Sequence, residues 1–92
     1  MNNQLLSKAA KKFGTPLYVY DAQKIRDQYK KLSTAFDGLP VKLHYAMKAL
    51  SNVDILRLLK NEGAELDAVS IEEVHLGLRA GYQPSSIMYT PN

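Results

Sequence analysis

The residues best placed to do chemistry lie at the ends of two predicted strands. The apolar run that starts at Val41 ends on Lys48, so an ammonium group closes the most strand-like stretch of the chain. Asp67 follows in the next predicted strand, and Glu73 lies one turn into the helix after it. Because ligands of parallel α/β folds gather at the carboxyl ends of the strands, we expect these side chains to share one rim. An amine that is partly desolvated there loses its proton more easily and can attack a carbonyl carbon.

Each of these residues also has an ordinary structural explanation. Lys48 could extend from the strand end into water without any role. Asp67 could be an acid that favours the positive end of the following helix, and Glu73 could form a capping box with Ser70. In the catalytic interpretation, Asp67 instead holds the charge state of the Lys48 amine or assists a proton transfer. Residue types and positions alone leave both interpretations open.

Neither a metal site nor a nucleotide-binding loop is predicted. The two histidines, His44 and His75, form no HxH or HxxxH pair, and no carboxylate cluster accompanies them. The sequence has no cysteine, no GxGxxG or Walker pattern and no G-x-S-x-G elbow. Of the strand neighbours His44 and Tyr45, only one can face a barrel interior. We therefore expect no metal ion and no cradle for the phosphates of a nucleotide.

Four predicted helices alternate with four predicted strands. Helices are expected over residues 5–13, 22–36, 53–60 and 71–80, and strands over residues 17–20, 41–47, 64–69 and 87–89. Asp21, Asn52 and Ser70 are suited to cap the later three helices. Single strands that alternate with helices predict parallel strands joined by right-handed crossovers. The expected fold class is α/β, the first portion of a parallel (β/α)8 TIM-type barrel that is incomplete within this chain.

Composition and charge are those of one folded domain. With 46% hydrophobic and 23% charged residues, the 92-residue chain can form a single domain with a modest core. The net charge of +3 comes from Lys and Arg residues that alternate with acids along predicted helices, so we expect solvated helix faces rather than a nucleic-acid surface. The chain start is unlike a signal peptide, and no apolar run approaches the roughly 20 residues of a membrane span. We expect a cytoplasmic location with no membrane partner.

Three ordered blocks of the sequence match a known pattern. The first is FGTPLYVYD, from Phe13 to Asp21, and the second is YAMKA, from Tyr45 to Ala49. The third runs from Gly63 to Ile87. It has the pattern G-x-x-x-D-x-x-S-x-x-E up to Glu73, followed by Ala80-Gly81, Pro84 and Ile87. Together they resemble the diaminopimelate decarboxylases, which are pyridoxal-phosphate enzymes of the alanine-racemase-like barrel class. The resemblance covers the chain from Phe13 onward.

The resemblance implies a cofactor, an activity and site residues. Lys48 would carry pyridoxal 5'-phosphate as a Schiff base, with Asp67 orienting the amine and Glu73 supporting it from the helix start. Tyr45 would pack beside the cofactor if its side of the strand faces inward, and Asn92 would belong to the cofactor rim. The implied reaction converts meso-diaminopimelate to L-lysine and CO2, within a homodimer in lysine biosynthesis. Residues 1–20 would be a lead-in helix and strand, and residues 21–92 the barrel units.

The sequence also departs from the family pattern. Leu50 stands where the family usually has Asn, Ile71-Glu72 where it has small residues, and Thr90-Pro91 where many members have His-Gly. Members continue through the rest of the barrel with a Gly-rich phosphate loop, and they use a cysteine from the second subunit, whereas this chain has none. We therefore expect an N-terminal fragment that is inactive alone and self-associates through open strand edges.

Two other functions stay open at this stage. One is another decarboxylase of the same barrel class that acts on ornithine, arginine or carboxynorspermidine, because most residues that read the substrate lie outside this chain. The other is a small anion-binding module without catalysis that uses the basic first third of the chain. Strong salt dependence of binding to an anionic polymer would favour the module.

Overall fold

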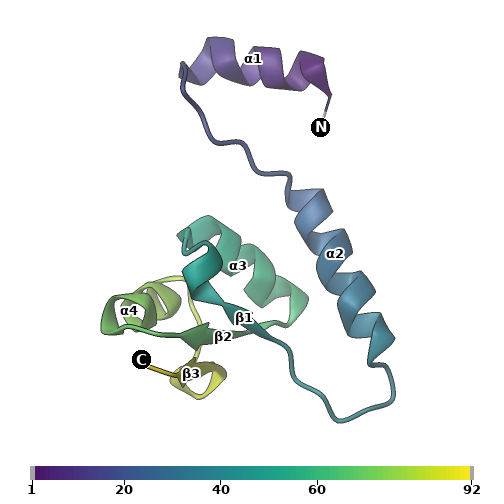
Figure 1. Cartoon of the computed structure of the whole chain (residues 1–92), viewed down its shortest axis with the longest axis vertical. Helices are drawn as coiled ribbons and strands as arrows, with labels where there is room; N and C mark the ends of the chain where they lie inside the picture. Colours follow the sequence, from purple (N-terminus) through teal and green to yellow (C-terminus); the bar gives the residue numbers. More distant parts are fainter. Residues whose placement is uncertain (1, 92) are drawn as a thin grey trace.

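The computed structural model describes residues 2–91 of the chain. Its elements are the helices and strands α1 (Asn3–Phe13), α2 (Ala22–Ala35), β1 (His44–Ala46), η1 (Met47–Ala49), α3 (Val53–Glu62), β2 (Glu65–Ala68), α4 (Ile71–Arg79), η2 (Pro84–Ser86) and β3 (Ile87–Tyr89), where η1 and η2 are 3-10 turns. The strands form one parallel sheet in the order β1-β2-β3, with α3 and α4 as the connecting helices (Figure 1). The predicted alternation of parallel strands and helices is confirmed from β1 onward.

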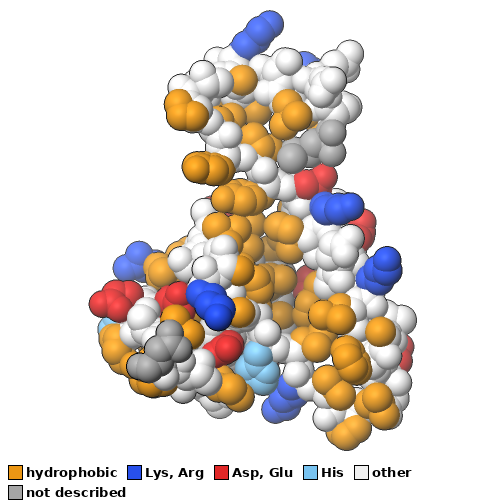
Figure 2. Space-filling view, in the orientation of Figure 1, with side chains coloured by type: hydrophobic (Ala, Val, Ile, Leu, Met, Phe, Trp, Pro, Cys, Tyr) orange, Lys and Arg blue, Asp and Glu red, His pale blue; other side chains and the backbone are white. Residues whose placement is uncertain are grey.

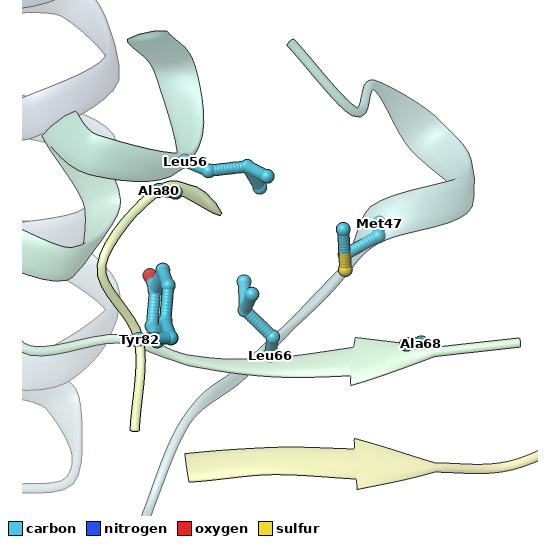
Figure 3. Packing of buried hydrophobic residues seen from close by; sticks show 6 residues of the cluster. All are labelled: Met47, Leu56, Leu66, Ala68, Ala80 and Tyr82. Atoms are coloured by element: carbon cyan, nitrogen blue, oxygen red, sulfur yellow. The ribbon is translucent and has the colours of Figure 1, made fainter. Parts of the chain in front are cut away.

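The hydrophobic core lies between this sheet and the helices α3 and α4. Met47, Leu56 and Leu66 are fully buried, and their side chains converge with Tyr82 on one side of β2 (Figure 3). Each such side chain stabilises the fold by about 2 kcal/mol through its removal from water. Because successive side chains of a strand point to opposite faces, Asp67 lies on the face of β2 that turns away from this core. The apolar residues thus decide which face of the sheet stays open for polar groups.

Local signals in the sequence fix both ends of α3. The side-chain oxygen of Asn52 accepts hydrogen bonds from the backbone N–H groups of Asp54, at 2.8 Å, and Ile55, at 3.2 Å. At the other end, Gly63 adopts a left-handed conformation with φ of 100°, which a residue without a side chain enters at little cost. The predicted cap and stop of this helix are both confirmed.

Removing the Asn52 cap is expected to weaken the fold measurably. The change Asn52→Ala leaves two helix N–H groups without their side-chain partner and should lower the free energy of unfolding by about 1 kcal/mol. Urea denaturation followed by circular dichroism measures the change. The matched control is Asn61→Ala near the other end of α3, which removes no cap. Equal losses in the two variants would contradict the capping role.

The predicted strand over residues 17–20 is wrong. This segment belongs to no strand of the described sheet, and Tyr18 is 88% exposed. Its aromatic and β-branched residues favour an extended backbone, but a strand also needs a neighbouring edge. The segment instead runs between α1 and α2, away from the sheet (Figure 1). The second predicted strand is shorter than expected, because residues 41–43 form a loop and Met47 begins η1.

Helix α1 adds little to the packed part of the molecule. None of its residues is buried, and Leu5, Leu6 and Phe13 are exposed. The radius of gyration is 15.2 Å, larger than the roughly 12 Å of a compact domain of this length. By contrast, α2 packs Ile25 and Tyr29 against a second cluster formed by α3 and its surroundings. No helix within residues 2–91 is long and apolar enough to cross a membrane.

Candidate active site

The carboxyl-terminal ends of the three parallel strands form the candidate site. Across the sheet, Asp67 of β2 pairs in register with Ala46 of β1 and with Met88 of β3. Register partners on neighbouring strands lie on the same face, so these three residues share the open face of the sheet. Asp67 thus stands in the middle of the row, with a strand on each side.

Lys48 lies in η1, two residues beyond the end of β1. Its neighbour Met47 is fully buried in the core, whereas Lys48 is exposed. Within residues 2–91, no ion pair engages its ammonium group. The expected position at a strand end is confirmed, but the expected partial desolvation is wrong. Water reaches Lys48 because no described element covers the open face of the sheet.

The carboxylate of Asp67 is held from the neighbouring strand. The Thr90 hydroxyl, directly after β3, donates a hydrogen bond to Asp67 Oδ1 at 2.5 Å. The Thr90 backbone N–H also donates to the carbonyl of Ala68 at 2.8 Å, which continues the β2–β3 ladder by one step. Sequence reasoning noted Thr90 only as a departure from a pattern. The signal that could have placed Thr90 at the same rim is its position directly after the predicted strand over residues 87–89.

Glu73 forms a capping interaction at the start of α4. The Ser70 hydroxyl accepts a hydrogen bond from the Glu73 N–H at 3.2 Å, and Glu73 Oε1 accepts one from the Val69 N–H at 2.8 Å. This is the reciprocal arrangement of a capping box, displaced by one residue at its return contact. The carboxylate therefore stabilises the turn that follows β2. A contact between Glu73 and a cofactor stays a prediction.

Tyr45 faces the helices and not the open side of the sheet. It pairs in register with the buried Leu66, and its hydroxyl donates a hydrogen bond to the carbonyl of Leu50 at 2.7 Å. Burial raises the pKa of the Tyr45 phenol above its ordinary value. The condition for packing beside the cofactor, an inward side chain, is not met in this chain. The structure thus separates Tyr45 from Lys48 and Asp67.

The open face carries His44 in place of Tyr45. His44 Nε2 lies 3.0 Å from Glu65 Oε2, and Lys42 Nζ lies 3.8 Å from the other oxygen of the same carboxylate. These groups lie on the same face as Asp67 but at the amino-terminal ends of the strands, opposite the rim. Among the described residues, no group of three or more His, Asp or Glu could hold a metal ion. Asn92 lies outside the described residues.

The site suits the attachment of an aldehyde cofactor such as pyridoxal phosphate. Such a cofactor needs a primary amine that is not tied into an ion pair, and the exposed Lys48 side chain provides one. The half-buried Asp67 carboxylate on the next strand can balance a positive charge near that amine. The two residues therefore fit the attachment end of the cofactor.

Comparison with curated proteins identifies close relatives. Over 85 residues the chain is 44% identical to a diaminopimelate decarboxylase of Methanothermobacter thermautotrophicus, covering 90% of this chain and 20% of the relative. Over 78 residues it is 47% identical to a diaminopimelate decarboxylase of Streptomyces coelicolor, covering 85% of this chain and 17% of the relative. The chain thus spans only about a fifth of the length of the curated relatives it matches.

Solved structures share the fold. A Vibrio vulnificus lysine/ornithine decarboxylase complexed with putrescine matches with a TM-score of 0.88 and 34% identity, over 96% of this chain and 24% of that one. A Helicobacter pylori diaminopimelate decarboxylase complexed with L-lysine matches with a TM-score of 0.82 and 36% identity, over 96% and 22%. These matches confirm the expected partial barrel. Residues 22–92 also match the family model of the pyridoxal-dependent decarboxylase, pyridoxal binding domain, so the chain belongs to this family of pyridoxal-binding domains.

Proposed function

We propose that this chain is the N-terminal part of a pyridoxal-phosphate-dependent diaminopimelate decarboxylase, which converts meso-diaminopimelate to L-lysine and CO2. The observation that carries the proposal is the position of Lys48, an exposed primary amine at the carboxyl end of a parallel strand. It shares its rim with the carboxylate of Asp67 in a pyridoxal-binding domain. Relatives of this chain with 44% and 47% identity are diaminopimelate decarboxylases.

The residues of this chain would bind and orient the reacting groups. When bound, pyridoxal phosphate supplies an electron-accepting ring that stabilises the charge left behind by a departing CO2. Lys48 would bind the cofactor through Nζ and, when released, would hold or deliver a proton at that atom. Asp67 would pair with a positive charge near Nζ and keep the amine oriented. Glu73 would act indirectly, by fixing the turn after β2 on which the position of Asp67 depends.

A second candidate function is a lysine or ornithine decarboxylase of the same barrel class. The Vibrio vulnificus lysine/ornithine decarboxylase supports it, because its TM-score of 0.88 is as high as those of the diaminopimelate enzymes. Both candidates use the same attachment residue and the same rim. They differ in the protein groups that recognise the end of the substrate far from the cofactor. These groups would come from other parts of a complete barrel.

Self-association is part of the proposal. Strands β1 and β3 each have a single neighbour in the described sheet, so both leave backbone groups open to pairing. Beside β1, exposed hydrophobic side chains gather over the end of α2 and the loop after it (Figure 2); they are Leu32, Phe36, Leu39 and Val41. We infer a homodimer for the complete enzyme, with residues 1–20 as a lead-in and residues 21–92 as barrel units. A cytoplasmic location stays a prediction.

The test is decarboxylation by the complete protein that contains this chain. Release of CO2 from meso-diaminopimelate is expected to exceed release from ornithine, arginine and carboxynorspermidine, each measured with added pyridoxal phosphate. The 92-residue chain alone is expected to stay at background, because the phosphate-binding loop implied by the family resemblance lies beyond it. Preferred turnover of ornithine would select the second candidate. No turnover of any of these amino acids, in a protein that binds the cofactor, would contradict both.

A further inference from the structure

We propose that Thr90 is a positioning residue that sets the orientation of the Asp67 carboxylate toward the strand end that carries Lys48. The inference rests on the proposed function, because it assigns a partner to a residue of that site. Among the described residues, the two hydrogen bonds of Thr90 both go to β2, to Ala68 and Asp67. Its effect on the site therefore passes through Asp67.

Two hydrogen bonds from Thr90 to β2 define its place. Its backbone N–H donates to Ala68 at 2.8 Å, and its hydroxyl donates to Asp67 Oδ1 at 2.5 Å. The first bond belongs to the parallel ladder, so it fixes the Thr90 backbone relative to the strand that carries Asp67. With the backbone fixed and a β-branched side chain that has few rotamers, the hydroxyl has little freedom to leave the carboxylate.

The other oxygen of the Asp67 carboxylate, Oδ2, has no hydrogen-bond or ion-pair partner among the described residues. A carboxylate offers about four acceptor positions on two oxygens, and Thr90 occupies one on Oδ1. On the β1 side, the register partner of Asp67 is Ala46, whose side chain is a single methyl group. A methyl group offers no hydrogen bond to Asp67, so Thr90 is the polar side chain that bonds this carboxylate among the described residues. Lys48 lies two residues beyond Ala46 at this end of the strand.

Two substitutions separate positioning from packing. Thr90→Val keeps the shape and the β-branch but removes the hydroxyl donor, while Thr90→Ser keeps the donor and loses the methyl group. Thr34→Val, on α2 and away from the sheet, makes the same chemical change elsewhere. If the hydroxyl positions Asp67, the fixed orientation of the Asp67 carboxylate is lost in the valine variant and retained in the serine variant. A hydroxyl that only strengthened the contact between β2 and β3 would change stability without changing the carboxylate rotamer.

The first measurement needs no cofactor. Three-bond couplings between the α and β protons of Asp67 report its side-chain rotamer in the 92-residue chain by NMR. One rotamer is expected to dominate in the wild type, in Thr90→Ser and in Thr34→Val. In Thr90→Val the couplings are expected to approach rotamer-averaged values. A single rotamer that persists in Thr90→Val would overturn the inference.

The second measurement is the selectivity of cofactor trapping. The chain is incubated with pyridoxal phosphate and reduced with borohydride, and the label on Lys48 is divided by the label on the surface lysines. This ratio is expected to fall about fivefold in Thr90→Val, which is the effect of losing one hydrogen bond. In Thr90→Ser the ratio is expected to equal that of the wild type. In an Asp67→Asn background, Thr90→Val is expected to cause no further fall. An undiminished fall in that background would show that Thr90 acts without Asp67 and would overturn the inference.

The two measurements distinguish failure of this inference from failure of the proposed function. A wild-type chain without selective label on Lys48 would count against Lys48 as the attachment residue. In that case the Asp67 couplings still decide whether Thr90 holds the carboxylate. Selective label that is equal in the wild type and in Thr90→Val would instead refute only the role of Thr90.

Discussion

Trapping with borohydride after incubation with pyridoxal phosphate is expected to label Lys48 in preference to the other lysines, and Lys48→Arg is expected to abolish that label completely. Lys48 combines an exposed primary amine, no ion pair within the described residues and a carboxylate on the adjacent strand. The arginine variant keeps the positive charge but replaces the amine by a guanidinium group, whose pKa above 12 leaves no neutral nitrogen to attack an aldehyde. Peptide mass mapping locates the label and measures its stoichiometry.

The matched control for this prediction is Lys60→Arg. Lys60 is an exposed lysine in the last turn of α3, on a different surface from the rim, so its replacement should leave the label on Lys48 unchanged. In the complete protein, Lys48→Arg should also reduce release of CO2 to background while Lys60→Arg retains it. Label scattered evenly over the surface lysines of the wild type, or equal total label in both variants, would refute Lys48 as the attachment residue.

The helices could be predicted from the sequence because their signals are local. Asn52 and Ser70 precede apolar residues at helical spacing, and each accepts the backbone hydrogen bonds that its position predicts. Gly63 ends α3 in the conformation that glycine favours. The predicted strand over residues 17–20 failed because a strand depends on a partner elsewhere in the chain. The composition of residues 17–20 does not indicate whether a strand of the sheet lies beside them.

The candidate site was predicted only where position along one strand decides it. Their positions showed that Lys48 and Asp67 lie at strand ends, but only the resemblance to the decarboxylase family favoured them as site residues. The sequence could not decide whether His44 or Tyr45 faces the open side, because neighbouring residues of a strand point to opposite faces and either could point inward. The structure decides it, since Tyr45 pairs in register with Leu66, which is buried. The bond between Thr90 and Asp67 depends on the register of two strands that are separated by a helix. Exposure of Lys48 depends on which elements cover the sheet, a property of the whole fold.

Alkaline conditions are expected to destabilise this fold through Tyr82. Its side chain is 5% exposed and lies in the core beside Leu66 and Ala80 (Figure 3), and its hydroxyl has no hydrogen-bond partner among the described residues. Burial raises the pKa of Tyr82 to about 12, and the nearby Tyr29 phenol adds to the shift. The folded protein therefore binds the phenolic proton more tightly than the unfolded chain, in which the pKa is about 10.

The sign of the pH effect follows from this difference. The contribution of Tyr82 to stability is fully present below pH of about 10 and is lost as the pH rises through about 12. A shift of this size corresponds to about 2 to 3 kcal/mol, a large part of the stability of a small domain. Tyr29 and Tyr45 also have raised pKa values because of burial, so they add to the same alkaline slope.

Replacing Tyr82 with Phe should remove most of this dependence. The change Tyr82→Phe keeps the ring in the core and deletes a buried hydroxyl without a partner, so the free energy of unfolding at neutral pH should stay constant or rise by about 1 kcal/mol. Between neutral pH and pH of about 11, the variant should lose much less stability than the wild type. Urea denaturation at a series of pH values measures both slopes, with the exposed Tyr18→Phe as control. Equal slopes for Tyr82→Phe and the wild type would show that the Tyr82 phenol ionises as easily in the folded protein as in the unfolded chain.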